Sequence, residues 1–516
     1  MHILVKMSEL ILILSTFILV FVRSLYSLYR LQGYDYYAVF KLKPFVVDCV
    51  LAITIGTVAL TTEYLLAVGY LAFGLLALLF TAFFGCGYYY KRTKFKFTAR
   101  GLRISLPFFF LCLALILALS LAFKGIYRLI SLSVLLLLRE FILFGVNGVI
   151  APFERKRNYR YAYNRTQPIR KENLIKIVIT GSYGKTTCKN ILTAILSKEY
   201  KVIATERNYN TPLGLVKSVE NIPPAGFSEC EKPVTFIAEA GARRVGDVGK
   251  ICSLVTPTYG IVTGVCAQHL DTFRNVERIK KAKQELADYI GKNGTVVFNG
   301  DNEYTLKMSE EFAGKGVVVG IKNGEIKLKN LKISILGSTF DLCYSGGVIP
   351  IKTSLLGRHN ALNIALSIAL ALEIGVSEES VMKAIGELEQ VEHRLELINS
   401  GGISILDDSY NANEVGVMEA LGLIATYSGR KVIYAQGVVE CGNKKRIINR
   451  KIGREMGKIA NVIILSGENT SHLKRGIKES GYAGKIYEFS NITHAEREFK
   501  NILRQGDILY IQNDIP

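Results

Sequence analysis

The uneven distribution of apolar residues divides this 516-residue chain into two parts and constrains its fold more than any other feature. The first part contains five apolar segments, at residues 8–22, 45–61, 64–85, 104–123 and 129–150. A helix that crosses a bilayer needs about 20 such residues. We therefore expect an α-helical membrane domain of about five spans over residues 1–153. The rest of the chain has the composition of a water-soluble protein.

Basic residues between the apolar segments predict the orientation of the spans. The first loop, the third loop and the residues after 150 hold most of the nearby lysine and arginine. The positive-inside rule then predicts a multi-pass protein of the cytoplasmic membrane, with its N-terminus outside and residues after 150 in the cytoplasm. Much of the net charge of +20 is thus explained by basic residues that set the orientation of the spans in the membrane. No aromatic–basic RNA motif accompanies it, so we expect a lipid bilayer and no nucleic acid as a partner.

Arg139 and Glu140 interrupt the fifth apolar segment. An ion pair inside a membrane is a candidate functional site. Alternatively, the span ends early and the pair lies at the interface. The sequence leaves both interpretations open, and with them the role of the membrane domain.

After a basic, polar linker at residues 154–171, strand and helix patterns alternate. The expected strands are 174–180, 234–241, 259–265 and 295–301, and the expected helices are 185–197 and 275–290. This order predicts a parallel sheet covered by helices. Glycine turns between short strands at 316–356 predict a small antiparallel sheet, and residues 360–376 predict an amphipathic helix. Together they form a P-loop central domain at 172–392.

A second, Rossmann-like α/β domain is predicted over residues 393–516. Alternation resumes there after Arg394, with expected strands at 402–408, 431–437, 461–467, 484–489 and 506–512. The expected fold class is therefore an α-helical membrane domain followed by two α/β domains.

The stretch IVITGSYGKTTCKNILTAIL at residues 177–196 is the strongest chemical signal. A strand leads through Gly181, Ser182 and Gly184 into a helix, where backbone N–H groups and the helix N-terminus form an anion cradle. Lys185 would reach the β- and γ-phosphates of ATP, Thr186 would ligate Mg²⁺, and Thr187 would belong to the same nucleotide-binding loop. The alternative is an ordinary glycine turn. The loop is shorter than a standard phosphate loop.

The shortened loop resembles the ATP loop of the Mur ligase superfamily, the ATP-dependent amide ligases of cell-wall and folate-polyglutamate synthesis. Their usual form is T-G-T-x-G-K-T, and Ser182 replaces its third residue. The resemblance continues in order from about residue 172 to 516. Residues 407–414, DDSYNANE, resemble a D-D-x-Y-N-A-N-P segment typical of the branch that adds D-alanyl-D-alanine. The substrate-site residues that the resemblance implies are Asn208, Asn210, Tyr410, Asn411 and Asn413.

The resemblance also implies metal ligands. Glu239 ends the expected strand 234–241 and would hold Mg²⁺, although it could be a solvated strand-end carboxylate. His269 lies in a histidine segment at 267–273 and would serve a second metal ion, unless it is structural.

Lys283 lies within the apolar stripe of the helix expected at 275–290. The stripe consists of Val276, Ile279, Lys283, Leu286 and Ile290, which share one face at helical spacing. A lysine there is costly unless paired or neutralised. In several branches of the family the matching lysine carries a carbamate and becomes a metal ligand. Alternatively, Lys283 extends to the surface.

The remaining nucleotide contacts come from two further segments. Residues 357–363 resemble the segment whose asparagine, here Asn363, contacts the adenine. Arg394 would contact a phosphate and Asp408 the nucleotide. These residues come from different domains, so the site would be complete only when the domains close.

The resemblance implies an ATP-dependent carbon–nitrogen ligase that activates a carboxylate as an acyl phosphate and joins it to an amino acid or dipeptide. The cell-wall precursor could be nucleotide-linked or lipid-linked, because five spans stand where soluble wall ligases carry a sugar-nucleotide domain. A folylpolyglutamate-type or other amino-acid ligase is the nearest alternative, and a membrane ATPase or transporter is another. A degenerate binding module would have lost Lys185, Glu239 or His269, and all three are present. The oligomeric state stays open.

Overall fold

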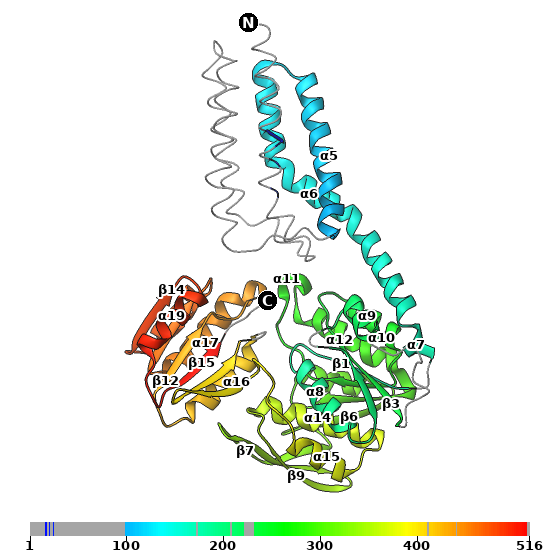
Figure 1. Cartoon of the computed structure of the whole chain (residues 1–516), viewed down its shortest axis with the longest axis vertical. Helices are drawn as coiled ribbons and strands as arrows, with labels where there is room; N and C mark the ends of the chain where they lie inside the picture. Colours follow the sequence, from blue (N-terminus) through cyan, green and yellow to red (C-terminus); the bar gives the residue numbers. More distant parts are fainter. Residues whose placement is uncertain are drawn as a thin grey trace. The chain divides into compact units, whose positions relative to one another are not determined.

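The computed structural model describes residues 16, 17, 20, 24, 99–171, 174–206, 209–220, 232–409, 412–439 and 441–512. The chain forms two compact units, Met1–Arg157 and Asn158–Pro516 (Figure 1). The predicted spans 45–61 and 64–85 lie outside the described residues, as does 8–22 apart from three isolated positions.

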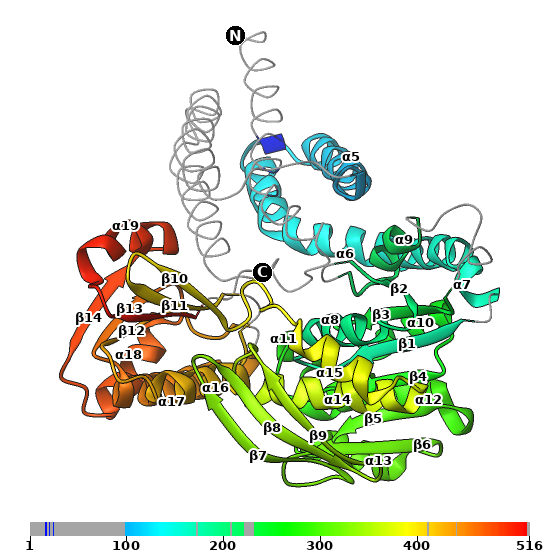
Figure 2. The same ribbon diagram turned by 60° about the horizontal axis from the view of Figure 1, so that its bottom comes forward.

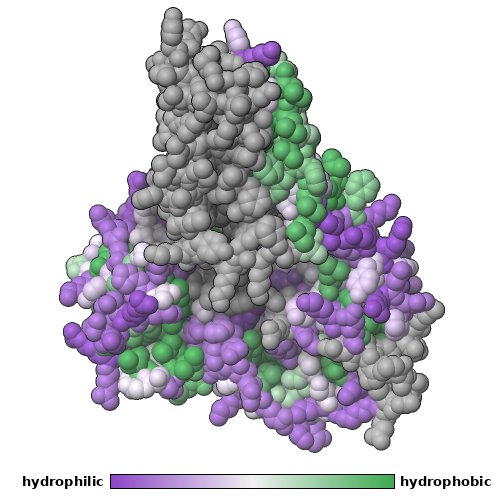
Figure 3. All heavy atoms as spheres, turned by 45° about the horizontal axis from the view of Figure 1, so that its top comes forward, coloured by the Kyte–Doolittle hydropathy of each residue, from purple (hydrophilic) through white to green (hydrophobic). Residues whose placement is uncertain are grey.

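The first unit contains two described helices, α5 (Ala99–Ala122) and α6, which begins at Gly125. Within the described part of the chain, α5 is the one helix long and apolar enough to cross a membrane. Both helices expose large apolar side chains, among them Phe110, Leu117, Leu121, Phe141, Val149 and Phe153. Figure 3 shows hydrophobic surface on the described part of the chain. Of the five predicted spans, one is thus supported by length and composition.

The ionic pair in α6 is buried. Arg139 is 1% exposed and Glu140 is 9% exposed, and Nη2 of the arginine lies 3.1 Å from Oε1 of the glutamate. The helix does not end at this pair, because α6 continues unbroken to Arg165.

The linker predicted at residues 154–171 is helical instead. Helix α6 covers it to Arg165, and α7 (Gln167–Lys171) follows after one residue. Ala162 and Ile169 are fully buried in the core of the second unit. Tyr159 packs against the same core at helical spacing. A narrow apolar stripe therefore lies within a segment whose overall composition is basic and polar.

A nine-stranded sheet forms the centre of the second unit, in the order β2-β3-β1-β4-β5-β6-β7-β8-β9. Its strands are β1 (Ile175–Thr180), β2 (Lys201–Ala204), β3 (Val234–Ala240), β4 (Tyr259–Val262), β5 (Thr295–Asn299), β6 (Lys315–Gly320), β7 (Ile326–Ser334), β8 (Gly337–Tyr344) and β9 (Gly347–Thr353). The strands from β2 to β7 pair in parallel, which confirms the predicted parallel sheet. Strand β1 lies between β3 and β4, so the residues after it lie at a point where the strand order reverses.

Helices cover both faces of this sheet (Figure 2). Alternate residues of β1 point to opposite faces, with Ile177 and Ile179 in one apolar cluster and Val178 in the other. The first cluster includes α8 (Lys185–Leu196), α14 (Arg358–Ile374) and α15 (Glu378–Gly386). The second includes α9 (Pro212–Glu220), α10 (Asp247–Val255), α12 (Val276–Ile290) and α13 (Glu303–Glu311).

Two local predictions for the central domain differ from the structure. The antiparallel strands β7, β8 and β9 extend the main sheet rather than forming a separate one, because β7 also pairs in parallel with β6. Helix α14 is not amphipathic, since every residue from Asn360 to Ala371 is buried. It packs against α8 on one side and the sheet on another, so polar residues on it are held inside the protein.

The C-terminal part of the second unit is a six-stranded sheet, in the order β10-β11-β15-β12-β13-β14. Its strands are β10 (Glu396–Ser400), β11 (Ile403–Asp408), β12 (Lys431–Ala435), β13 (Val462–Ser466), β14 (Lys485–Phe489) and β15 (Ile508–Gln512). Its helices are α16 (Glu414–Ala425), α17 (Lys445–Ile459), α18 (Thr470–Glu479) and α19 (Ile492–Ile502). All five predicted strands are present, and β10 adds an antiparallel edge.

Candidate active site

The loop between β1 and α8 is held in a conformation that favours glycine at two positions. Gly181 has φ +154° and Gly184 has φ +74°. A Cβ on Gly181 would lie 1.9 Å from Oγ1 of Thr263. The N–H of Ser182 donates to the carbonyl of Gly264 at 2.8 Å, and its hydroxyl accepts from the N–H of Cys266 at 3.2 Å. The segment after β4 therefore braces the loop.

The carboxylate of Glu239 faces the start of α8. In the β1–β3 ladder Glu239 is level with Ile179, at the carboxyl end of the sheet. The hydroxyl of Thr186 donates to its Oε2 at 2.8 Å, and Nδ2 of Asn210 donates to its Oε1 at 3.2 Å. Glu239 is 2% exposed. Oxygen donors in this arrangement are the kind that Mg²⁺ prefers, so these residues fit the predicted ion.

Two lysines share the electrostatic environment of Glu239. Nζ of Lys185 donates to the carbonyl of Gly181 at 2.9 Å. Burial lowers the pKa of Lys185, and the charge of Glu239 partly offsets that shift. Lys283 on α12 is 3% exposed, which confirms its predicted place in the apolar stripe. Burial, followed by the charge of Lys185, lowers the pKa of Lys283 to about 7.

Asn363 on α14 packs against the phosphate loop. Its Oδ1 accepts from the thiol of Cys188 at 3.4 Å, and its Nδ2 lies 3.5 Å from Oδ1 of Asn360. A Cβ on Gly184 would lie 2.5 Å from Oδ1 of Asn363. The structure places this amide beside the phosphate loop, and the contact with the adenine that the resemblance implies for Asn363 stays a prediction.

Arg394 reaches the loop from the segment that joins the two sheets. Its Nη2 lies 3.5 Å from Oγ1 of Thr186. The residues on either side, His393 and Leu395, have φ of +60° and +53°, which is uncommon for residues other than glycine. Burial raises the pKa of Asp408 to about 6, an effect that the Arg394 guanidinium opposes. The hydroxyl of Tyr510 donates to Oδ2 of Asp408 at 3.3 Å.

The other predicted site residues are placed less directly. His269 is half-buried and precedes α11 (Leu270–Phe273), where its carbonyl accepts from the N–H groups of Thr272 and Phe273. Asn413 is the N-cap of α16, and its side chain accepts from the N–H of Gly416 at 3.0 Å. Asn208, Tyr410 and Asn411 lie outside the described residues.

Three residues near the loop were missed by the sequence reasoning. Tyr183 forms a hydrogen bond with Asn302, whose amide donates to the carbonyl of Val265 at 2.9 Å. Lys189 is buried one helical turn after Lys185. The four-residue spacing from Lys185 could have identified Lys189, since such residues share a helix face. Nothing local indicated the partner of Tyr183.

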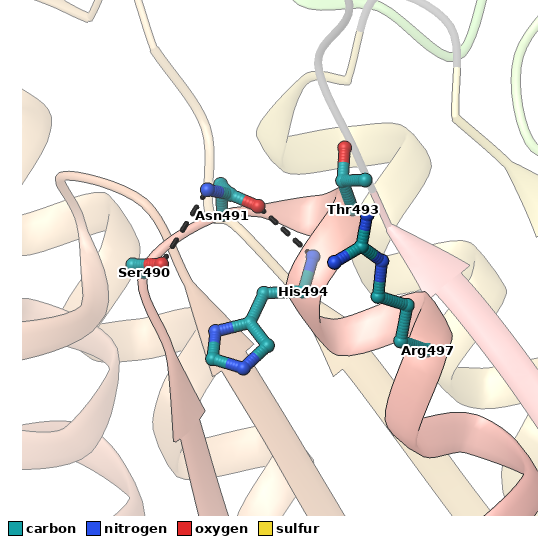
Figure 4. Close-up of a pocket in the computed structure, with 5 residues that line it drawn as sticks. All are labelled: Ser490, Asn491, Thr493, His494 and Arg497. Atoms are coloured by element: carbon teal, nitrogen blue, oxygen red, sulfur yellow. Dashed lines mark hydrogen bonds between the residues drawn. The ribbon is translucent and has the colours of Figure 1, made fainter.

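Two other features of the described residues do not extend this site. Ligand atoms of His393, Glu396 and Asp407 lie within 4.8 Å of one another. They are already paired, since Nδ1 of His393 lies 2.7 Å from Oδ2 of Asp407 and the backbone N–H of His393 donates to Oε2 of Glu396 at 3.0 Å. The pocket in Figure 4, between β14 and α19, contains none of the predicted site residues; it is lined by Ser490, Asn491, Thr493, His494 and Arg497.

Comparisons with known proteins agree with this geometry. Residues 179–371 match the Mur ligase middle domain, and residues 393–512 match the Mur ligase, glutamate ligase domain. A UDP-N-acetylmuramoyl-tripeptide–D-alanyl-D-alanine ligase of Buchnera aphidicola is 28% identical over 344 residues, which cover 66% of this chain and 72% of that protein. Other curated relatives with that name are covered over 48% to 65% of their length.

Solved structures share the fold of the second unit. A crystal structure of MurF from Acinetobacter baumannii aligns with a TM-score of 0.62 at 22% identity, over 70% of this chain and 77% of that one. The MurF ligase from Thermotoga maritima in complex with ADP aligns with a TM-score of 0.59 at 20% identity, over 69% of this chain and 80% of that one.

Proposed function

The central and C-terminal parts of this chain are Mur ligase domains, and from that premise we propose an ATP-dependent ligase of cell-wall precursor synthesis. It joins the carboxylate of the precursor to the amine of an amino acid or dipeptide. The observation that carries the proposal is the Thr186–Glu239 hydrogen bond at the mouth of the phosphate loop, with Lys185 beside it. The names of the relatives point to D-alanyl-D-alanine as the amine and a muramoyl peptide as the acceptor.

The chain's residues divide the work of positioning and charge neutralisation. The backbone of the loop from Gly181 to Gly184 and the N-terminus of α8 receive the phosphates of ATP. Thr186 and Glu239 would hold Mg²⁺, and the ion would supply neutralisation of the negative charge on the phosphates. Lys185 releases the Gly181 carbonyl and turns to the phosphates. Arg394 brings a second positive charge from the segment between the sheets.

The reaction has two balanced steps. A carboxylate oxygen of the precursor attacks the γ-phosphorus of ATP, and the bond to the β,γ-bridging oxygen breaks and releases ADP. The amine nitrogen then attacks the carbonyl carbon of the acyl phosphate, inorganic phosphate leaves, and the amine loses a proton. Burial of Glu239 and Lys283 keeps water away from this region of the site. Because the pKa of Lys283 is lowered to about 7, a large share of this lysine is neutral at pH 7 and available for carbamate formation, and the carbamate would hold a further metal ion with His269.

We further propose that the enzyme works at the cytoplasmic face of the cell membrane, as a multi-pass protein. The apolar composition of α5 and the exposed apolar side chains of α5 and α6 support this location. A lipid-linked precursor becomes a candidate acceptor alongside a nucleotide-linked one. No observation favours the transporter alternative, and the DDSYNANE segment favours a wall ligase over a folate-type ligase.

The test uses the purified full-length protein in detergent or nanodiscs. It is given ATP and Mg²⁺ with D-alanyl-D-alanine, D-alanine or glutamate, and with a nucleotide-linked or lipid-linked muramoyl peptide. Phosphate release that requires both the amine and the acceptor, together with the amide product by mass spectrometry, supports the proposal. Phosphate release from ATP that neither substrate changes would contradict it. The Lys185→Met variant controls for contaminating ATPases.

A further inference from the structure

Lys189 is a buried cation that the proposed mechanism does not use. It lies on α8, one turn after Lys185, and is 2% exposed. A lysine withdrawn from water is costly unless its ammonium group is paired. Its side chain points toward the carboxyl ends of β2 and β3, where its contacts explain why the cation is retained.

The ammonium group of Lys189 has two partners around Glu239. Nζ donates to the carbonyl of Thr205 at 2.6 Å and lies 4.0 Å from Oε2 of Glu239. Thr205 is itself tied to β3, because its hydroxyl accepts from the N–H of Glu239 at 3.2 Å. Lys189 therefore connects α8, the end of β2 and the acidic residue of β3.

The hydrogen bonds to the Glu239 carboxylate come from neutral donors. Thr186 donates to Oε2 and Asn210 donates to Oε1. Contacts that involve a charged group are stronger than those between neutral groups, so a charged partner fixes the orientation of a carboxylate more firmly than neutral donors do. The Lys189 ammonium group lies beside Oε2, the same oxygen that accepts from Thr186, and it therefore fixes the side of the carboxylate that faces Thr186.

We propose that Lys189 is a positioning residue, which holds the Glu239 carboxylate in the orientation in which it can bind a divalent cation with Thr186. This inference rests on the proposed function only in taking Glu239 as the metal ligand of a nucleotide site. Groups that orient metal ligands in this way typically change metal affinity by about 10- to 100-fold when they are removed.

Lys176 offers a matched control. It is also a buried lysine, 9% exposed, at the opposite end of β1. Its Nζ contacts the carbonyl of Arg170 at 3.4 Å and Oγ1 of Thr256 at 3.3 Å. Lys176→Met therefore removes a buried cation from the same sheet without touching the carboxylate of Glu239.

The experiment measures binding of a fluorescent ATP analogue to the full-length protein, first in EDTA and then as Mg²⁺ is added. For Lys189→Met we expect the Mg²⁺ concentration at half-maximal effect to rise about 10- to 100-fold, with binding in EDTA unchanged. Lys176→Met should match the wild type in both. Lys189→Arg, which keeps the charge, should recover part of the Mg²⁺ dependence.

A second comparison tests whether Lys189 acts through Glu239. In a Glu239→Gln background, Lys189→Met should cause no further change in Mg²⁺ dependence. A Lys189→Met protein with lower thermal stability but wild-type Mg²⁺ dependence would overturn the inference, as would a loss of binding in EDTA. A wild type without Mg²⁺-dependent binding would overturn it too. Failure of ligation with intact Mg²⁺-dependent binding would contradict only the proposed function.

Discussion

Gly184 and Asn363 are packed so closely that a Cβ on the glycine would lie 2.5 Å from Oδ1 of the asparagine. Gly184 also has φ +74°, so any side chain there meets both backbone strain and a steric clash. We expect Gly184→Ala to destabilise the protein by about 1–3 kcal/mol and to abolish nucleotide binding. Circular dichroism on heating suits a chain without tryptophan, and a fluorescent ATP analogue measures binding.

Gly246 provides the control for strain alone. It precedes α10 with φ +94°, and a Cβ there would have nothing within 4 Å. Gly246→Ala should cost about 1–2 kcal/mol from the left-handed conformation and leave nucleotide binding unchanged. Equal nucleotide affinities of the two variants would contradict the role given to the loop.

The hydroxyl of Thr186 can be removed with little change in shape. Thr186→Val breaks the 2.8 Å hydrogen bond to Glu239. We expect substrate-dependent phosphate release to fall about 10- to 100-fold, because both the metal ligand and its orienting partner are altered. Thr186→Ser should retain most activity. Thr193→Val on the same helix removes a buried hydroxyl that has no hydrogen-bond partner in the described structure, and should change nothing.

Because the pKa of Lys283 is lowered, we expect that replacing this lysine stabilises the protein by an amount that depends on pH. The lysine pKa is 10.5 in the unfolded chain and about 7 in the folded protein. Between these values the unfolded chain binds more protons, so the stability of the wild type rises with pH. Lys283→Met removes the free-energy cost of burying an ionisable lysine. The melting temperature of this variant should therefore exceed that of the wild type by about 5 °C near pH 7.

The difference should shrink toward pH 10. The melts are run without carbon dioxide, since a carbamate would change the charge of Lys283. Lys281→Met, an exposed lysine on the same helix, should show no such trend. A lower melting temperature for Lys283→Met at every pH would mean that a charged lysine is stabilised at this position.

The His393–Asp407 hydrogen bond predicts a second, opposite pH trend. This bond raises the pKa of His393 above its ordinary value of 6.5. Its stabilisation is therefore fully present below pH 6.5 and is lost as pH rises through the folded value. The His393 side chain is 51% exposed, so we expect His393→Gln to cost less than about 1 kcal/mol at pH 6 and nothing at pH 9.

Thermal melts from pH 5.5 to 9 measure this trend. Asp407→Asn should remove the same pH dependence with little further loss, because the side-chain oxygen of asparagine can still accept from the N–H of Ser409. If melting temperature changes with pH at different slopes in the two variants, the His393–Asp407 hydrogen bond does not account for the pH dependence of stability.

Local pattern determined the elements that build the site. The strand expected at 174–180 is β1, and the helix expected at 185–197 is α8 within one residue at its end. Glycine at 181 and 184 identified the turn between them, because its positive φ is costly for other residues. The prediction of an ATP-dependent carbon–nitrogen ligase is confirmed by the matched domains and the relatives. It could be made from the sequence because the motifs of such a ligase are short and contiguous.

Tertiary structure alone decided which of these elements meet. Thr186 and Glu239 lie 53 positions apart, and Arg394 and Thr186 lie 208 apart. Strand pairing on either side of β1 and packing of α14 create these contacts, and neither has a local signal. The contacts of Lys189 were decided in the same way: its four-residue spacing from Lys185 is visible in the sequence, but its partners at the ends of β2 and β3 are not. Periodicity reports which face of an element is buried, but not against what it is buried.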